Sequence, residues 1–186
     1  GVGSSLLDAL TVENSLLFVQ QGGRKVREFF YSLEADGFLT RDVSLLSDHL
    51  LTEGIVDWTV QRSTAFHVWC VLKDGSAVCM TLNREQNIVA WHAHRLEHGR
   101  ILSVASLRSS QDTQDEEVWF TVERGEGEHA CITVERMAEG NEYLDACTEA
   151  VVRDGRLSGL RHLAGCEAVL MDGNGFCSTI LVDGEG

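Results

Sequence analysis

The sequence predicts an all-β protein of antiparallel four-stranded sheets, arranged like the blades of a partial β-propeller, with a small β-domain appended. Three observations lead to this prediction. Hairpin patterns recur about 50 residues apart, which is typical of propeller blades. Only one segment has a helical pattern. The turns between apolar runs depend on Gly and Asp, because the 186 residues include no Pro.

Three aligned segments each combine an apolar strand, a Gly-containing turn and a second strand, which is the pattern of a β-hairpin. They occupy 15–31, 67–83 and 117–136. Further apolar runs at 55–61 and 101–106 precede the second and third hairpins. We therefore expect the same order of strands in successive units of the repeat.

The middle unit contains a complete set of strands. We expect them near 55–61, 67–73, 76–83 and 87–95. In the second strand, Val68, Cys70 and Leu72 share one face, while the apolar Trp69 and Val71 occupy the other. Two apolar faces fit a stack of blades, whereas a β-sandwich, the alternative, predicts cleaner alternation. About two to two and a half blades are too few to close a ring, so we expect a fragment of a longer protein or an assembly with other copies.

One segment, 42–52, predicts a short helix over the end of a blade. Asp42 is a good N-cap residue and Gly54 a common helix terminator. Between them an apolar face is formed by Leu45, Leu46, Leu50 and Leu51. The alternative is a compact loop with a single helical turn.

The pattern of apolar residues changes from about Glu139. We place the blade-like region at 1–140 and a small, incomplete β-domain at 141–186, with the boundary near 140–148. Short strands with Asp-Gly or Gly-rich turns are expected in this domain. They lie at 151–156, 167–172 and 177–182.

The formal net charge is −14, which argues against a nucleic-acid-binding surface of clustered basic residues. Lysine occurs only at Lys25 and Lys73. Solubility explains the acidic balance most simply, and the charge is also compatible with an acidic wall along which DNA slides without binding. No apolar run approaches the roughly 20 residues that span a bilayer, and no signal peptide is recognisable.

The six cysteines are too irregularly spaced for a disulfide framework, and none forms a Cys-x-x-Cys pair. We expect buried free thiols, as in a protein that folds in a reducing cytoplasm. If Asp74-Gly75 forms a two-residue hairpin turn, Cys70 and Cys79 face each other. Their Cα atoms then lie about 4.5 Å apart, within reach of a disulfide, although free thiols remain the expectation.

His92 and His94 are two residues apart on an expected strand, so their side chains share a face. His67 and His98 are candidates to lie nearby. A zinc site needs three or four ligands and a further set of contacts to orient them, and the sequence fixes no third ligand. We therefore expect solvated or hydrogen-bonded imidazoles.

The remaining candidate sites also favour structural explanations. An acidic cluster lacks the spacing of a calcium-binding loop; its members are Asp112, Asp115, Glu116 and Glu117. The glycines at 22–23 and 173–175 form turns, since no helix or Lys follows them as a phosphate site requires. Four tryptophans on expected strands are assigned to the core rather than to a platform for sugars or bases. They are Trp58, Trp69, Trp91 and Trp119.

No Gly-x-Ser-x-Gly motif or other nucleophile arrangement is present in the sequence. We accordingly predict no catalytic residue, no metal ligand, no cofactor and no enzymatic activity.

Several segments resemble stretches of tail proteins from short-tailed bacteriophages and prophages. They are 17–29 (LFVQQGGRKVREF), 42–50 (DVSLLSDHL), and 83–86 (NREQ) followed by 89–92 (VAWH). Residues 143–145 (YLD) and 159–165 (GLRHLAG) also match the small β-domain that follows the blades in these proteins. Over roughly 15–183 the chain is thus similar to the C-terminal portion of the tail nozzle, or tail tubular protein B, family. The motifs are structural, so they are distinctive as a set and weak singly.

The resemblance implies a β-propeller-containing virion subunit and no catalytic residues. It implies that the full-length protein forms a homo-oligomeric ring around the DNA exit channel, through which DNA passes non-specifically. The implied partners are other tail subunits, namely the adaptor ring and the tail fibres. The implied location is the virion tail, with assembly in the host cytoplasm. The chain departs from the family in lacking the N-terminal blades and the strands after Val182.

Two other classes of function are consistent with the sequence. One is a phage or prophage β-propeller binding module that recognises a glycan or a protein through exposed loops. The other is a hydrolase acting on cell-wall material, which requires a cleft with paired carboxylates. The sequence supplies no preferred carboxylate pair.

Overall fold

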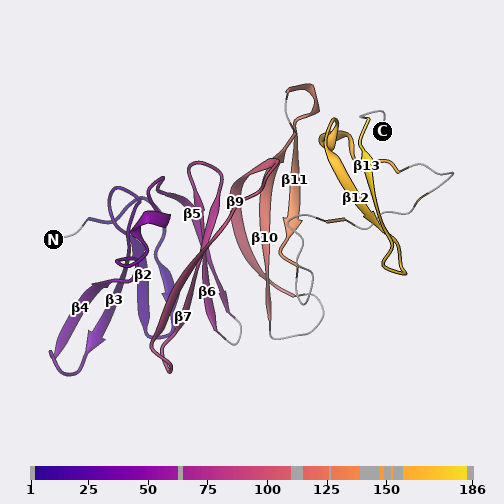
Figure 1. Ribbon diagram of the computed structural model, residues 1–186. Coiled ribbons are helices and arrows are strands. Elements are labelled where there is room, and N and C mark those ends of the chain that lie inside the picture. Colours follow the sequence, from indigo (N-terminus) through magenta and orange to yellow (C-terminus); the bar gives the residue numbers. More distant parts are fainter. Residues whose placement is uncertain are drawn as a thin grey trace.

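The computed structural model describes residues 3–62, 65–109, 115–125, 127–138, 147–148, 152 and 157–183. These residues form four antiparallel sheets that follow one another along the chain, and each connects sequential strands by hairpins (Figure 1). The all-β class and the antiparallel sheets are therefore confirmed, and two of the sheets have the expected four strands. None of the helices in this described part is long and apolar enough to cross a membrane.

The first sheet has the order β1-β2-β3-β4 and the second the order β5-β6-β7-β8. The strands of the first sheet are Leu10–Val12, Ser15–Val19, Val26–Ser32 and Gly37–Asp42. Those of the second sheet are Ile55–Arg62, Phe66–Leu72, Ala77–Asn83 and Ile88–His94. The four strands expected in the middle unit are confirmed to within one or two residues. β1 and β4 were not predicted: β1 is only three residues long, and β4 has no fully buried residue to mark it as a strand.

The third sheet has three described strands in the order β11-β10-β9, and the small sheet pairs β12 with β13. The third-sheet strands are Gly99–Arg108, Glu116–Arg124 and Cys131–Arg136. The small sheet consists of Glu167–Met171 and Cys177–Leu181. Two of the three strands expected near the C-terminus are thus confirmed. The third, at 151–156, lies outside the described residues apart from position 152, as does most of the boundary at 140–148.

The three large sheets stack face to face, with one apolar core in each gap. The first core lies between the first and second sheets and the second core between the second and third sheets. Val68, Cys70 and Leu72 of β6 contribute to the first core, while Trp69 and Val71 contribute to the second. Successive side chains of a strand point to opposite faces, so the continuous apolar run of β6 serves two cores. The predicted burial of both faces is confirmed.

The first strands of the three sheets are neighbours in space. β5 contacts both β1 and β9, and Figure 1 shows the sheets side by side in chain order, from indigo to orange. The first strand of each sheet therefore lies next to the first strand of the neighbouring sheet, as in a repeating array.

The prediction of a helix at 42–52 is wrong. β4 extends to Asp42, whose carboxylate accepts hydrogen bonds from the Ser44 N–H at 2.9 Å and the Ser44 hydroxyl at 2.8 Å. This local turn competes with helix initiation, and only a 3₁₀ turn forms, at Asp48–Leu50. Leu51 is fully buried, but Leu46 is 92% exposed, so the leucines do not form one apolar face. The alternative, a compact loop with one helical turn, describes the segment.

The prediction that Cys70 and Cys79 face each other across the hairpin is also wrong. The Leu72 N–H donates to the Ser76 carbonyl at 2.8 Å, so the hairpin loop has three residues rather than two. Gly75 closes it with φ at 86°, the left-handed conformation that a three-residue hairpin loop requires. One extra residue moves every side chain of β7 to the other face. Cys70 therefore pairs with Val78, and Cys79 with Trp69.

We expect both thiols to be unreactive in the folded protein. Burial raises the pKa of Cys79 to about 12 and raises the pKa of Cys70 further, and only the thiolate is nucleophilic. Native titration with an aromatic disulfide reagent at neutral pH should label the exposed Cys177 and leave Cys70 and Cys79 free and unlabelled. Labelling of Cys70 at the rate of Cys177, located by peptide mass spectrometry, would contradict the burial of β6.

Candidate functional site

The predicted histidine group lies on the second sheet, on the face that packs toward the third sheet. The rings of His92 and His94 have centroids 4.8 Å apart, and the Trp69 ring lies 4.9 Å from His94. His67 is close enough to His92 to interact electrostatically, whereas His98 offers its carbonyl to Arg124. No group of three or more metal-ligating side chains gathers among the described residues. The imidazoles therefore belong to the packing around Trp69.

The histidine group predicts a loss of stability in mild acid. Burial lowers the pKa values of His67 and His92, and the neighbouring His92 lowers that of His67 further. A folded-state pKa below the unfolded value favours the neutral ring, so stability is present above about pH 6.5 and is lost as the pH falls below it. Urea denaturation across this range should show a falling midpoint. The slope should be smaller in His92→Gln than in the wild type, because the substitution removes one of the two imidazoles whose pKa is lowered.

Glu116 and Glu117 of the acidic cluster are engaged by different protein partners. Glu116 accepts the Arg62 N–H at 2.7 Å and the Ser106 hydroxyl at 2.9 Å. Glu117 accepts from Arg136 at 3.0 Å, and Asp112 lies outside the described residues. These contacts hold neighbouring strands together and do not converge on one point.

A buried charge cluster, which sequence reasoning missed, joins the first and second sheets. The Glu28 side chain is fully buried and is paired with both Arg41 and Arg84. Arg84 lies in the turn after β7, hydrogen-bonds to the Ser15 hydroxyl and pairs with Glu13 at 2.8 Å. Glu28 and Arg41 belong to the first sheet and Arg84 to a turn of the second, so the ion pairs cross-link the two sheets. Glu28 shares one face of β3 with the apolar Val26 and Phe30, and a charged residue between two apolar ones on a single face was the signal available in the sequence.

Three of the four tryptophans pack in the cores as predicted. Trp58 and Trp69 are buried, and the Trp91 indole donates to the Val43 carbonyl at 3.0 Å. Trp119 is different: it lies on the free face of the third sheet and donates to its neighbour Glu117 at 3.2 Å. Its assignment to the core is wrong, because no described element covers this face.

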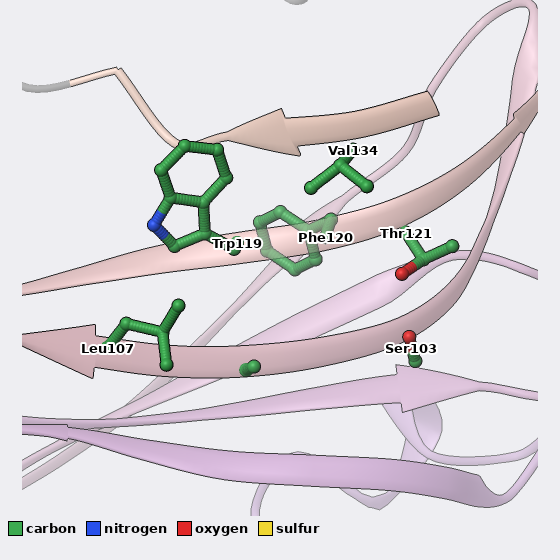
Figure 2. A pocket seen from close by; sticks show the side chains of 7 residues that line it. Ser103, Leu107, Trp119, Phe120, Thr121 and Val134 are labelled. Carbon is green, nitrogen blue, oxygen red and sulfur yellow. The ribbon is translucent and has the colours of Figure 1, made fainter. Parts of the chain in front are cut away.

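We call this surface the third-sheet outer face. Its apolar side chains come from all three strands of the sheet. They are Ala105, Leu107, Trp119, Ile132 and Val134. All of them except Ile132 line a shallow hollow of ≈ 340 Å³ (Figure 2). Val134 is 67% exposed and Leu107 is 55% exposed. Ion pairs of Arg136 with Glu117 and of Arg100 with Glu123 lie toward its ends.

The opposite end of the stack carries a second such surface, the first-sheet outer face. Its apolar side chains are Leu16, Phe18, Phe29, Tyr31 and Phe38. The Phe29 and Phe38 rings stack with centroids 5.0 Å apart, and Tyr31 meets Phe38 edge to face at 5.4 Å. A hollow of ≈ 190 Å³ lies between them and the β1–β2 turn.

The aligned repeat relates the two outer faces to the two cores. Leu17, Trp69 and Trp119 occupy one position of the repeat, on β2, β6 and β10 respectively. Leu17 packs in the first core and Trp69 in the second, whereas Trp119 is on the third-sheet outer face. Val118 and Trp119 are consecutive apolar residues of β10, so they point to opposite faces. This pair was the signal in the sequence for two apolar faces on the third sheet.

Comparisons with known proteins do not assign a family. No protein-family model matches the chain, and no curated protein matches it significantly. The fold, the two outer faces and the segments quoted above are therefore the basis for any functional conclusion.

Proposed function

We propose that the chain is a structural subunit of a bacteriophage or prophage tail, contributing propeller-like blades to the nozzle or tail tube. One observation supports this most: antiparallel sheets that recur along the chain and pack in series through apolar faces. In such an array each large sheet shares an apolar core with the next. The resemblance of the quoted segments to phage tail proteins is the reason for assigning this architecture a role in the virion.

The electrostatic composition is consistent with the same role. The net charge of −14 repels phosphate, so a wall built from such subunits lets DNA pass without binding it. In this proposal the partners are the adaptor ring, the tail fibres and other copies of the full-length subunit. The protein acts in the virion tail after assembly in the host cytoplasm, and it performs no catalysis.

The proposal is tested on phage particles produced by a strain that carries the gene. Quantitative mass spectrometry of purified particles should find the protein in the tail fraction at a fixed multiple per virion. Disruption of the gene should yield DNA-filled heads without functional tails, and complementation should restore infectivity. Infectious particles that lack the protein would refute the proposal. A defined glycan bound by the isolated chain would then favour the alternative of a binding module.

A further inference from the structure

We propose that the first-sheet outer face of one chain packs on the third-sheet outer face of a second copy, so that copies associate head to tail. The inference goes beyond the virion role and does not depend on it. It rests on an interface that already occurs twice within the chain, between the first and second sheets and between the second and third sheets. The two outer faces are the two sides of that interface, each exposed at one end of the stack.

The internal interfaces always join unlike faces. At the first interface, the face that carries Leu17 meets the face of the second sheet that carries Cys70. At the second interface, the face that carries Trp69 meets the face of the third sheet that carries Phe120. Leu17 and Trp69 are equivalent in the repeat, and so are Cys70 and Phe120. Both interfaces therefore pair the same two kinds of face: the face that carries Leu17 or Trp69 packs on the face of the next sheet that carries Cys70 or Phe120.

The exposed faces have the residue types that this pairing requires. Trp119 is the equivalent of Trp69, and Phe18 is the equivalent of Phe120. Trp69 and Phe120 meet edge to face, with ring centroids 5.6 Å apart, an arrangement that aromatic pairs favour. Trp119 of one copy and Phe18 of the next can form the same kind of contact. An apolar centre with charged pairs toward its ends is also the usual composition of a protein interface.

Symmetry determines the expected size of the assembly. A contact between unlike faces closes into a ring when the rotation permits it. The described residues of two copies supply six large sheets, which is within the usual range of about four to eight propeller blades. In such a closed pair both outer faces of both copies are covered. We expect a dimer of the 20.5 kDa chain.

The experiment is light scattering and sedimentation velocity on the 186-residue chain, in moderate salt that screens repulsion between acidic copies. Wild type should be a dimer. Val134→Lys blocks the third-sheet outer face and Phe38→Lys the first-sheet outer face, and each should be monomeric. Both side chains are about two-thirds exposed in the single chain, at 67% and 66%, so folding should be retained. Val169→Lys, which changes an equally exposed residue of the small sheet at 68%, should remain dimeric.

Mixing the two blocked variants distinguishes head-to-tail packing from packing of like faces. Each variant keeps the face that the other has lost, so the mixture should form a one-to-one complex through a single interface. Leu107→Lys and Leu16→Lys repeat the test at second positions, and cooperative unfolding confirms that each variant is folded. A monomeric wild type at high concentration, a dimer that survives either blocking substitution, or a mixture that stays monomeric would overturn the inference. None of these results bears on the presence of the protein in virions, which particle mass spectrometry measures separately.

Discussion

Trp69→Ala is expected to lower the free energy of unfolding by about 3–5 kcal/mol, the usual cost of removing a large aromatic side chain from a core. Trp69 is only 6% exposed and packs against Phe120 and His94. Its indole also donates to Gln61 at 3.1 Å, so truncation leaves that amide without its donor. Equilibrium denaturation in urea, followed by circular dichroism, measures the change.

Trp119→Ala is the matched control, because it removes the same side chain at the equivalent position of the repeat. Trp119 lies on the third-sheet outer face, so its loss creates no buried cavity. In dilute solution, where copies do not associate, we expect a change of about 1 kcal/mol or less, as for most surface substitutions. If both variants lost the same free energy of unfolding, burial in the second core would not be the reason why Trp69 stabilises the protein.

Arg84→Met is expected to destabilise the protein by about 3 kcal/mol, because it removes one of the two partners of a buried carboxylate. Glu28 has no exposed surface, and its remaining partner Arg41 has a half-exposed side chain. The substitution also releases the contacts of Arg84 with Ser15 and Glu13. Denaturation in urea at neutral pH measures the loss.

Two further variants show whether the buried charge is the cause. Arg100→Met removes the exposed pair with Glu123, whose atoms are 3.4 Å apart, and should cost less than about 1 kcal/mol. The double variant Glu28→Gln/Arg84→Met should be more stable than Arg84→Met alone, since it leaves no buried negative charge. A double variant that is less stable than Arg84→Met would show that shape, and not charge, governs this site.

Much of the fold was predictable, because strands and hairpins are specified by local patterns. Apolar runs rich in β-branched and aromatic residues mark β5 to β8, and Asp74-Gly75 marks the turn between β6 and β7. The segment 42–52 was mispredicted because leucine spacing carries no information about which leucines find partners. Leu51 reaches the first core, whereas Leu45 and Leu46 remain in solvent.

The candidate site was less predictable than the fold. The sequence correctly placed His92 and His94 on one face and assigned three tryptophans to the cores. It could not separate Trp69 from Trp119, because both lie in similar apolar strands and differ in whether another sheet packs on the face that carries the tryptophan. Burial depends on that neighbour, which a local pattern does not contain.

The sequence by itself determined the all-β class, the order of the hairpins and the presence of two apolar faces on the second sheet. Only the tertiary structure decided which faces are covered, that Glu28 is enclosed between Arg41 and Arg84, and that Cys70 and Cys79 serve different cores. The physical reason is the distance along the chain over which each kind of interaction acts. Turn chemistry and side-chain alternation act over a few residues, whereas burial and charge pairing depend on residues tens of positions away, and a single extra residue in one loop reverses the faces of a strand.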